Sequence, residues 1–202
     1  MAQDSSRPEF WDSRYRDHVT PWDKGESPAG LVAFARTLPP GTRVLVPGCG
    51  TGHEAVFLAR AGLDVLALDF SAAAVQAARE TAGPFAHRIV QADFFDFDVG
   101  TGFDVFYERA FLCALPRHLW PAYATRAAQV LRAGGCLAGF WFFDDNDRGP
   151  PFGTSNPGLQ ALLGTGFRQE CDEPVTDSLP IFEGRERWQV WRLTTAAALP
   201  ST

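Results

Sequence analysis

Lysine, paired cysteines and long apolar runs are scarce in this 202-residue sequence, and each shortage excludes a class of protein. Lys24 is the only lysine among the 18 basic residues, while 24 acidic residues bring the net charge to −6. A protein that binds a phosphate backbone needs clustered cations to displace counterions, and here the arginines are scattered. We therefore expect no nucleic-acid partner.

The cysteines predict neither a disulfide framework nor a zinc site. They are widely spaced, with no CxxC pair and no cluster with histidine, at positions Cys49, Cys113, Cys136 and Cys171. Such spacing fits a reducing cytosol, so we expect a cytoplasmic protein without a metal centre. The abundance of arginine and alanine suggests a bacterial genome rich in G and C.

Neither a signal peptide nor a membrane association is predicted. The N-terminal stretch MAQDSSRPEFWD lacks the apolar core of a signal peptide. The longest apolar run, at residues 133–143, contains three glycines and is too short to cross a bilayer. The sequence shows no internal repeat and no linker, so residues 1–202 predict a single domain with one core.

Strands and helices are predicted to alternate along most of the chain. Ser27 is expected to cap a helix over residues 28–38 that opens with Pro28. Apolar runs predict strands at residues 43–47, 64–69, 88–91, 103–107, 136–143, 167–173 and 186–193, and helical patterns predict helices at residues 53–61, 71–81, 119–131 and 156–163. This alternation is typical of an α/β fold with a doubly wound, mostly parallel sheet. Ligands of such sheets bind beyond the carboxyl ends of the strands.

A glycine-rich loop, Gly48-Cys49-Gly50-Thr51-Gly52, follows the first predicted strand. It lacks the lysine of a phosphate-binding P-loop, and His53 stands where the dinucleotide fingerprint has its last glycine. Alternating glycines let the backbone approach a ligand closely, and the next helix directs its first amides toward a carboxylate. Taken alone, the loop is also compatible with an ordinary strand-to-helix turn.

Two aspartates follow the next two strands in register with that loop. Asp69 ends the second strand, 17 residues after Gly52, where a carboxylate can accept from both hydroxyls of a ribose. Asp93 follows the third strand, where it can accept from an adenine amine while Phe94 covers the ring. Each aspartate alone could cap a helix or be solvated, but together with the loop they predict binding of S-adenosylmethionine.

This arrangement resembles the class I S-adenosylmethionine-dependent methyltransferases, with one departure. Their first motif carries an acidic residue before the glycines, whereas this sequence has Val46 and Pro47 there. With this departure, the sequence resembles the thiopurine S-methyltransferase family and the related plant thiol and halide methyltransferases. The resemblance covers residues 10–167 and rests on TPWD (20–23), LVPGCGTGHEAVFLARAG (45–62), ALDFSAAAV (67–75), YERAFLCALP (107–116) and GPPF (149–152).

The resemblance implies a Rossmann-like fold with seven strands, helices on both faces and an antiparallel final strand. It implies transfer of a methyl group from S-adenosylmethionine to a small thiol, a thiopurine or another soft nucleophile, with sulfide, halide, selenium and tellurium species open. The alternatives are an O- or N-methyltransferase of another metabolite and a non-catalytic protein that binds the cofactor. A monomer or weak dimer is expected.

The segment YERAF, after the fourth strand, is where the two branches of the family differ. Arg109 matches an arginine that the thiopurine enzymes place near the acceptor, whereas the plant enzymes have an aromatic residue there. Phe111 and its successors look more like the plant pattern. Arg109 is the predicted catalytic residue because a guanidinium favours a thiolate. An ion pair with Glu108 or another carboxylate is the alternative.

Aromatic side chains complete the expected site. Residues 1–40 are predicted to form a helical cover over the cofactor, because aromatic faces suit a cationic sulfonium. The full prediction for cofactor contacts is Trp11, Trp22, Gly48, Cys49, Gly50, Asp69, Phe70, Asp93, Phe94 and Glu108. The acceptor is expected at Arg109, Phe111 and Phe152, and core packing is the alternative for the aromatic residues. The loop at 144–152, with Asp144, Asp145 and Asp147, is expected to be solvated.

Overall fold

The computed structural model describes residues 4–146 and 148–194, which form a seven-stranded sheet in the order β3-β2-β1-β4-β5-β7-β6. Asp147 and the two ends of the predicted domain lie outside the described residues. The strands are β1 (Arg43–Pro47), β2 (Asp64–Asp69), β3 (Ile89–Gln91), β4 (Phe103–Arg109), β5 (Leu131–Phe142), β6 (Phe167–Pro174) and β7 (Glu186–Leu193). β1 to β5 pair in parallel, and β7 is antiparallel to both β5 and β6. The predicted fold, including its antiparallel final strand, is confirmed.

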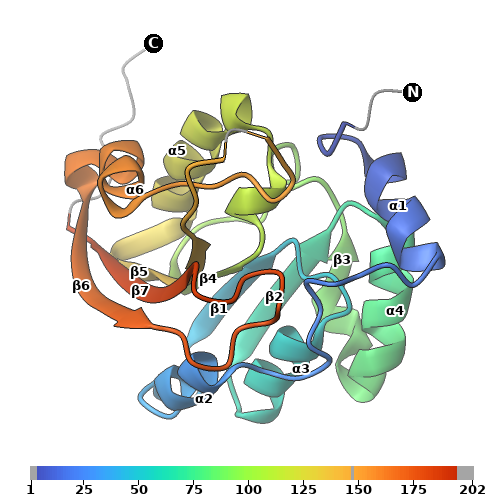
Figure 1. Cartoon of the computed structure of the whole chain (residues 1–202). Coiled ribbons are helices and arrows are strands. Elements are labelled where there is room, and N and C mark those ends of the chain that lie inside the picture. The colour runs from blue at the N-terminus through green and yellow to red at the C-terminus, as the bar shows by residue number, and fades with distance from the viewer. Residues whose placement is uncertain (1–3, 147, 195–202) are drawn as a thin grey trace.

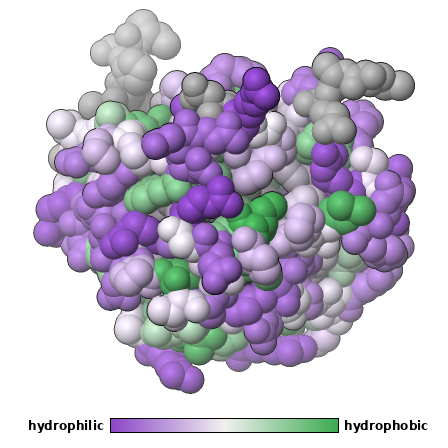
Figure 2. Space-filling view, viewed as in Figure 1, coloured by the Kyte–Doolittle hydropathy of each residue, from purple (hydrophilic) through white to green (hydrophobic). Residues whose placement is uncertain are grey.

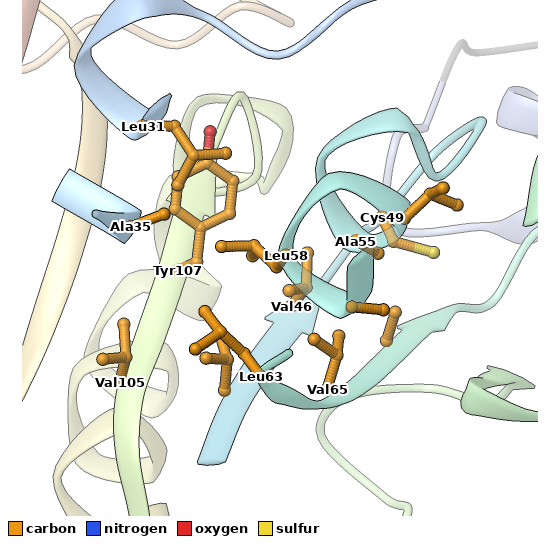
Figure 3. Close-up of a cluster of buried hydrophobic side chains, with 14 of the residues drawn as sticks. Leu31, Ala35, Val46, Cys49, Ala55, Leu58, Leu63, Val65, Val105 and Tyr107 are labelled. Atoms are coloured by element: carbon orange, nitrogen blue, oxygen red, sulfur yellow. The ribbon is translucent and has the colours of Figure 1, made fainter. Parts of the chain in front are cut away.

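Helices cover both faces of this sheet, as Figure 1 shows. They are α1 (Pro8–Arg16), α2 (Ala29–Ala35), α3 (His53–Arg60), α4 (Ala72–Ala82), α5 (Trp120–Val130) and α6 (Asn156–Leu163). Helices α2, α3 and α4 share one apolar cluster with the sheet, part of which is drawn in Figure 3, and α5 and α6 share the other. Val44 and Leu45, neighbours on β1, face opposite clusters and are fully buried, as expected of a strand covered on both faces.

The starts of α2 and β5 differ from the sequence prediction because distant residues set them. Pro28, and not Ser27, occupies the cap position of α2, and the Ala29 N–H donates to the Asp177 carboxylate at 3.0 Å. The strand predicted to begin after Gly134-Gly135 starts at Leu131, because β5 already pairs there with Phe103. A sequence pattern cannot show a helix cap supplied from a position 148 residues away.

Helix α1 was predicted only as part of a helical cover, and its docking on α4 positions the N-terminal segment. Asp12 Oδ1 accepts hydrogen bonds from Ser71 Oγ at 2.6 Å and from the Ala73 N–H at 3.1 Å. Ser71 Oγ in turn accepts from the Ala74 N–H, so Ser71 caps α4 as predicted. One carboxylate thus ties α1 to the amino-terminal turn of α4, at the sheet edge where β2 ends.

Within residues 4–146 and 148–194, no helix combines the length and the apolar character needed to cross a membrane. Cys49, Cys113 and Cys136 are buried, Cys171 is partly buried, and all four are free thiols.

Candidate active site

A cavity of about 310 Å³ lies at the carboxyl ends of β1, β2 and β4, under the N-terminal segment. On the face seen in Figure 2, some apolar residues are visible near the middle and others are scattered among the polar residues. The cavity wall includes most of the residues predicted from sequence, namely Trp11, Trp22, Gly48, Cys49, Gly50, Asp69, Phe70, Asp93, Phe94, Arg109 and Phe111. The structure therefore brings together residues from segments spread over a hundred positions of the chain.

The glycine loop forms the floor of the cavity, and two of its glycines are needed there. Gly48 and Gly50 have φ values of 61° and 54°, in the left-handed region that favours glycine. A Cβ on Gly48 would collide with the ring of Phe111, and one on Gly50 would lie 2.8 Å from Tyr15 Oη. Phe111 and Tyr15 can therefore pack closely against the loop only because these positions lack side chains.

Asp69 is a buried carboxylate at the end of β2. Its oxygens accept from the Gly50 N–H at 3.0 Å and from the Ser71 N–H at 2.9 Å. Burial raises the pKa of Asp69 from its ordinary 3.8 to about 6, although these amides oppose the shift. A buried carboxylate that keeps acceptor capacity toward a cavity suits a ligand with hydroxyl donors.

Asp93 and the phenylalanines after β3 form the next part of the wall. Asp93 Oδ1 accepts from the Phe95 N–H at 2.8 Å, which fixes the turn, and its side chain is partly exposed. The Phe94 ring packs edge-on against Phe111 with ring centroids 5.5 Å apart. This corner therefore offers a carboxylate and flat apolar surfaces, the combination predicted for an adenine.

Three aromatic residues of the N-terminal segment lie over the cavity. Trp22 packs edge-on against Trp11, with centroids 5.3 Å apart, and against Tyr15 at 6.1 Å. Asp23 joins this cover to the floor, because its carboxylate accepts from Thr51 Oγ1 at 2.5 Å and from the Gly25 N–H at 2.9 Å. Within the N-terminal segment, the residues that line the cavity end at Asp23. Helix α2, which follows, packs instead against β5 and β7.

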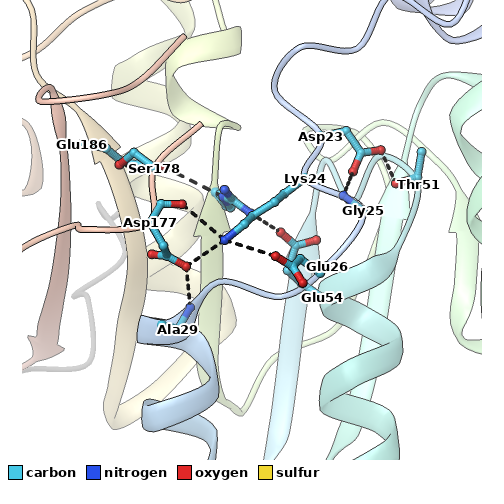
Figure 4. Close-up of polar contacts among 11 residues, drawn as sticks. Asp23, Lys24, Gly25, Glu26, Ala29, Thr51, Glu54, Asp177, Ser178 and Glu186 are labelled. Atoms are coloured by element: carbon cyan, nitrogen blue, oxygen red, sulfur yellow. Dashed lines mark hydrogen bonds and ion pairs between the residues drawn. The ribbon is translucent and has the colours of Figure 1, made fainter. Parts of the chain in front are cut away.

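A second attachment fixes the cover to the connection between β6 and β7. The Lys24 ammonium lies 2.9 Å from the Asp177 carboxylate, which also accepts from the Ala29 N–H. Figure 4 shows this contact beside the contact between Asp23 and Thr51. Residues 20–26 are therefore attached both to the glycine loop and to the connection between β6 and β7.

Arg109 ends β4 with its side chain only 6% exposed, between two carboxylates. Its Nη1 donates to Glu54 Oε1 at 3.0 Å, and its Nε lies 3.9 Å from Glu186 Oε1. Burial lowers the pKa of Arg109, but the neighbouring carboxylates more than offset this and the net shift is upward. Nε and Nη2 have no hydrogen-bond partner within the described part of the chain. Arg109 is therefore a charged, partly unsatisfied donor in the cavity wall.

Tyr107 lies two residues before Arg109 and on the same face of β4, where Figure 3 shows its ring beside Leu31 and Ala35. The side chain lines the cavity, is only 2% exposed, and its hydroxyl has no hydrogen-bond partner among the described residues. Burial, and then the charge of Glu54, raises the pKa of Tyr107 well above its usual range. Such a hydroxyl is a neutral hydrogen-bond donor.

Two predicted residues, Glu108 and Phe152, lie outside the cavity wall. Glu108 is 1% exposed, points to the opposite face of β4, and accepts from the backbone N–H groups of Phe111 and Leu112. Adjacent residues of a strand face opposite sides, so Glu108 cannot face the cavity beside Arg109, and the ion pair considered between them is absent from the structure. The Phe152 N–H donates to the Cys113 carbonyl, while Pro150 and Pro151 reach the cavity.

Several cavity residues escaped sequence reasoning. Tyr15 and Glu54 lie in helical segments, where no sequence pattern distinguishes them from surface residues. Ile181 and Phe182 lie in the irregular connection between β6 and β7. Among the cavity residues that were missed, Tyr107 alone had a signal in the sequence, because it is a tyrosine at the end of a predicted buried strand.

The sheet order, the glycine loop after β1 and the buried carboxylate after β2 define the class as Rossmann-like, S-adenosylmethionine-dependent methyltransferases. The fold is shared with a Burkholderia thailandensis 1,6-didemethyltoxoflavin-N1-methyltransferase, solved with S-adenosylhomocysteine, at a TM-score of 0.74 and 18% identity over 93% of this chain and 87% of that one. The chain belongs to the thiopurine S-methyltransferase family, whose model matches residues 6–199. It is therefore a methyltransferase that uses S-adenosylmethionine.

Its relatives come from both branches of the predicted resemblance. A thiocyanate methyltransferase 1 of Brassica oleracea is 32% identical over 190 residues, covering 90% of this chain and 84% of the relative. A thiopurine S-methyltransferase of Bordetella petrii is 33% identical over 175 residues, covering 76% and 80%. The predicted family, enzyme class and cofactor are confirmed.

The residues of the cavity fit the cofactor. The glycine loop and Asp69 both line the cavity of about 310 Å³, and Asp69 supplies a buried carboxylate to its wall. We expect Asp69 to hold the ribose, Asp93 and Phe94 the adenine, and Trp22 the cationic end. These assignments remain predictions, and those of Trp22 and Asp69 can each be tested by a binding experiment.

Trp22→Ala is expected to weaken binding of S-adenosylmethionine by about 2- to 30-fold, because an aromatic face near a cation contributes about 0.5–2 kcal/mol. The change in the free energy of unfolding should be about 1 kcal/mol or less, since Trp22 is only partly buried. Calorimetry and denaturant unfolding measure the two quantities. Phe97→Ala, which removes an exposed aromatic outside the cavity, is the control. A large loss of stability with unchanged affinity would show that Trp22 is a core residue.

Cofactor affinity is expected to fall as the pH decreases through about 6. Only the ionised Asp69 carboxylate accepts from two hydroxyls, and burial holds its pKa at about 6. Below that pH the dissociation constant should rise about tenfold per unit. The free energy of unfolding of the cofactor-free protein should show the opposite pH dependence. The folded state binds the Asp69 proton more tightly than the unfolded state, so protonated Asp69 stabilises the fold below about pH 4, and this contribution is lost as the pH rises to about 6. A pH-independent affinity between 5 and 8 would contradict this role.

Proposed function

We propose that the methyl acceptor is a small organic thiol or thiopurine that binds with its sulfur beside Arg109. One observation carries the proposal, namely that Arg109 Nε and Nη2 are buried donors without partners in a wall that is otherwise largely apolar. Phe111, Ile181 and Phe182 supply apolar surfaces to the same cavity. A soft sulfur nucleophile on an apolar body complements such a site, because a guanidinium favours the thiolate form.

When bound, S-adenosylmethionine supplies an electrophilic methyl group on a cationic sulfur. The residues of this chain align and dehydrate the reactants, which is most of what such a displacement needs. Arg109 would hold the acceptor sulfur, and Trp11 and Trp22 would exclude water from above. The contacts of the cover with Thr51 and with Asp177 hold these indoles in place.

Matched acceptors test the proposal. With saturating S-adenosylmethionine, thiophenol and a thiopurine should be methylated, whereas phenol and aniline should not. Thiocyanate belongs in the same panel because a relative is named for it. Methylation of phenol or aniline without thiophenol would favour the O- or N-methyltransferase alternative. Cofactor binding without transfer to any acceptor would favour the non-catalytic alternative.

We further propose that the protein is a bacterial, cytoplasmic, single-domain enzyme in which the part of the N-terminal segment that lines the cavity, up to Asp23, covers the cofactor. The free cysteines and the net charge of −6 support a reducing compartment and argue against nucleic-acid or membrane partners. A monomer or weak dimer is expected, which sedimentation at several concentrations measures.

A further inference from the structure

Arg109 has more negative than positive charge around it. Glu54 on α3 forms a hydrogen-bonded ion pair with it, and Glu186 on β7 lies 3.9 Å from its Nε. Both carboxylates are largely buried, with side chains 19% and 4% exposed. The guanidinium therefore has counter-ions before any acceptor arrives, and a thiolate that entered as an anion would add a further negative charge to the cluster.

The two carboxylates differ in their access to the cavity. Glu54 lines it, while Glu186 is outside the wall and accepts a hydrogen bond from Ser178 Oγ at 2.8 Å. Figure 4 shows Glu186 beside Ser178 and Glu54 on the first turn of α3. Glu54 accepts one hydrogen bond, at Oε1, from Arg109, and its Oε2 accepts none among the described residues. Glu54 therefore lines the cavity beside Arg109 with one carboxylate oxygen that accepts no hydrogen bond from the described residues.

We propose that Glu54 is the general base of the reaction and removes the proton of the acceptor thiol. The inference rests on the proposed function, in which the acceptor is a thiol beside Arg109. The S–H bond breaks, its proton passes to Glu54 Oε2, and the electron pair remains on the acceptor sulfur. That pair then forms the new S–CH3 bond as the bond between the methyl group and the cofactor sulfur breaks, leaving its electrons on that sulfur. Glu54 afterwards releases the proton to solvent.

The geometry keeps Arg109 paired throughout this step. As Glu54 becomes neutral, the thiolate replaces it as the counter-ion, so the buried guanidinium is never left alone. A proton that left directly for solvent would instead place a third negative group beside Glu54 and Glu186. Tyr107, with its unpartnered hydroxyl in the same wall, can donate a hydrogen bond to the sulfur without adding charge.

The other ionisable groups around Glu54 do not replace it as the base. Arg109 and Tyr107 face it from β4, and Cys49 faces it from the glycine loop. Burial raises the pKa values of the Tyr107 hydroxyl and the Cys49 thiol well above their usual ranges, so both stay protonated. Glu186, across Arg109, does not line the cavity.

Two thiols of different acidity test the proposal in wild type and in Glu54→Gln. An aliphatic thiol is protonated at pH 7, whereas 4-nitrothiophenol is already a thiolate and needs no base. Glu54→Gln should lower kcat for the aliphatic thiol by about 100-fold and change kcat for the thiolate by less than about threefold. Above a pH of about 9, where the aliphatic thiol ionises in solution, the variant should recover. Affinity for S-adenosylhomocysteine, measured by calorimetry, should not change.

Glu186→Gln is the matched control, because it removes the other carboxylate beside Arg109 and should affect both thiols by the same factor. Equal losses for both thiols in Glu54→Gln, or no loss for either, would overturn the role of Glu54. If Glu54→Gln does not fold, Glu54→Asp, which keeps a shorter carboxylate, should still slow the aliphatic thiol more than the thiolate. Failure of wild type to methylate either thiol while it binds the cofactor would instead refute the proposed function.

Discussion

Asp69→Asn is expected to weaken S-adenosylmethionine binding at pH 8 by at least about 100-fold. The substitution keeps the size of the side chain and one backbone acceptor, but it removes the charge that would receive two ribose hydroxyls. Each hydrogen bond to a charged group contributes about 1.5–3 kcal/mol. Isothermal titration calorimetry with S-adenosylmethionine measures the loss directly.

The same variant should not destabilise the free protein to a comparable degree. Burial raises the pKa of Asp69 to about 6, so the ionised carboxylate is costly at pH 8 and its removal offsets the weakened amide contacts. We expect the free energy of unfolding to change by less than about 2 kcal/mol. Asp64→Asn, at the exposed start of the same strand, is the control and should leave affinity unchanged. Unchanged affinity in Asp69→Asn would refute its role in the site.

Arg109→Met is expected to reduce both activity and stability, for separable reasons. Without the guanidinium, kcat for thiol methylation should fall by about 100-fold or more, as expected when a charge-stabilising donor is removed. The free energy of unfolding should fall by about 3–5 kcal/mol, because Glu54 and Glu186 are left as buried, unpaired carboxylates.

The double variant Arg109→Met/Glu54→Gln separates the two effects. Removing one of the stranded carboxylates should restore part of the stability while activity stays low. Arg187→Met, at a partly exposed pair with Asp172, controls for loss of an arginine and should cost about 1 kcal/mol or less. Wild-type kcat in Arg109→Met would contradict its contact with the acceptor. Recovery of activity in the double variant would contradict it equally.

The cofactor half of the site was largely predictable from sequence, because its residues are local to strand ends. Gly48, Gly50 and Asp93 each follow a strand, Asp69 ends one, and parallel strands bring their carboxyl ends to one edge. Trp22 could be predicted as a cover only once that edge was expected to hold a cation. These inferences needed nothing beyond periodicity, glycine chemistry and the family motifs.

The acceptor half was less predictable because its chemistry depends on pairings across the chain. Arg109 was identified, but its partner is Glu54, 55 positions earlier, and not the adjacent Glu108. Glu54 lies in an ordinary amphipathic helix, and Glu186 begins a late strand. The attachment of Lys24 to Asp177 joins positions 153 residues apart. No local pattern encodes such contacts, since tertiary packing alone sets them.

A crystal structure of the complex with S-adenosylhomocysteine and an aryl thiol tests the central claim most directly. The ribose hydroxyls should lie within hydrogen-bond distance of Asp69, with the indole of Trp22 over the sulfur end of the cofactor. The acceptor sulfur should contact Arg109 and lie next to Glu54 Oε2. A cofactor bound away from Asp69, or a thiol bound outside the cavity between β4 and the N-terminal cover, would contradict the account.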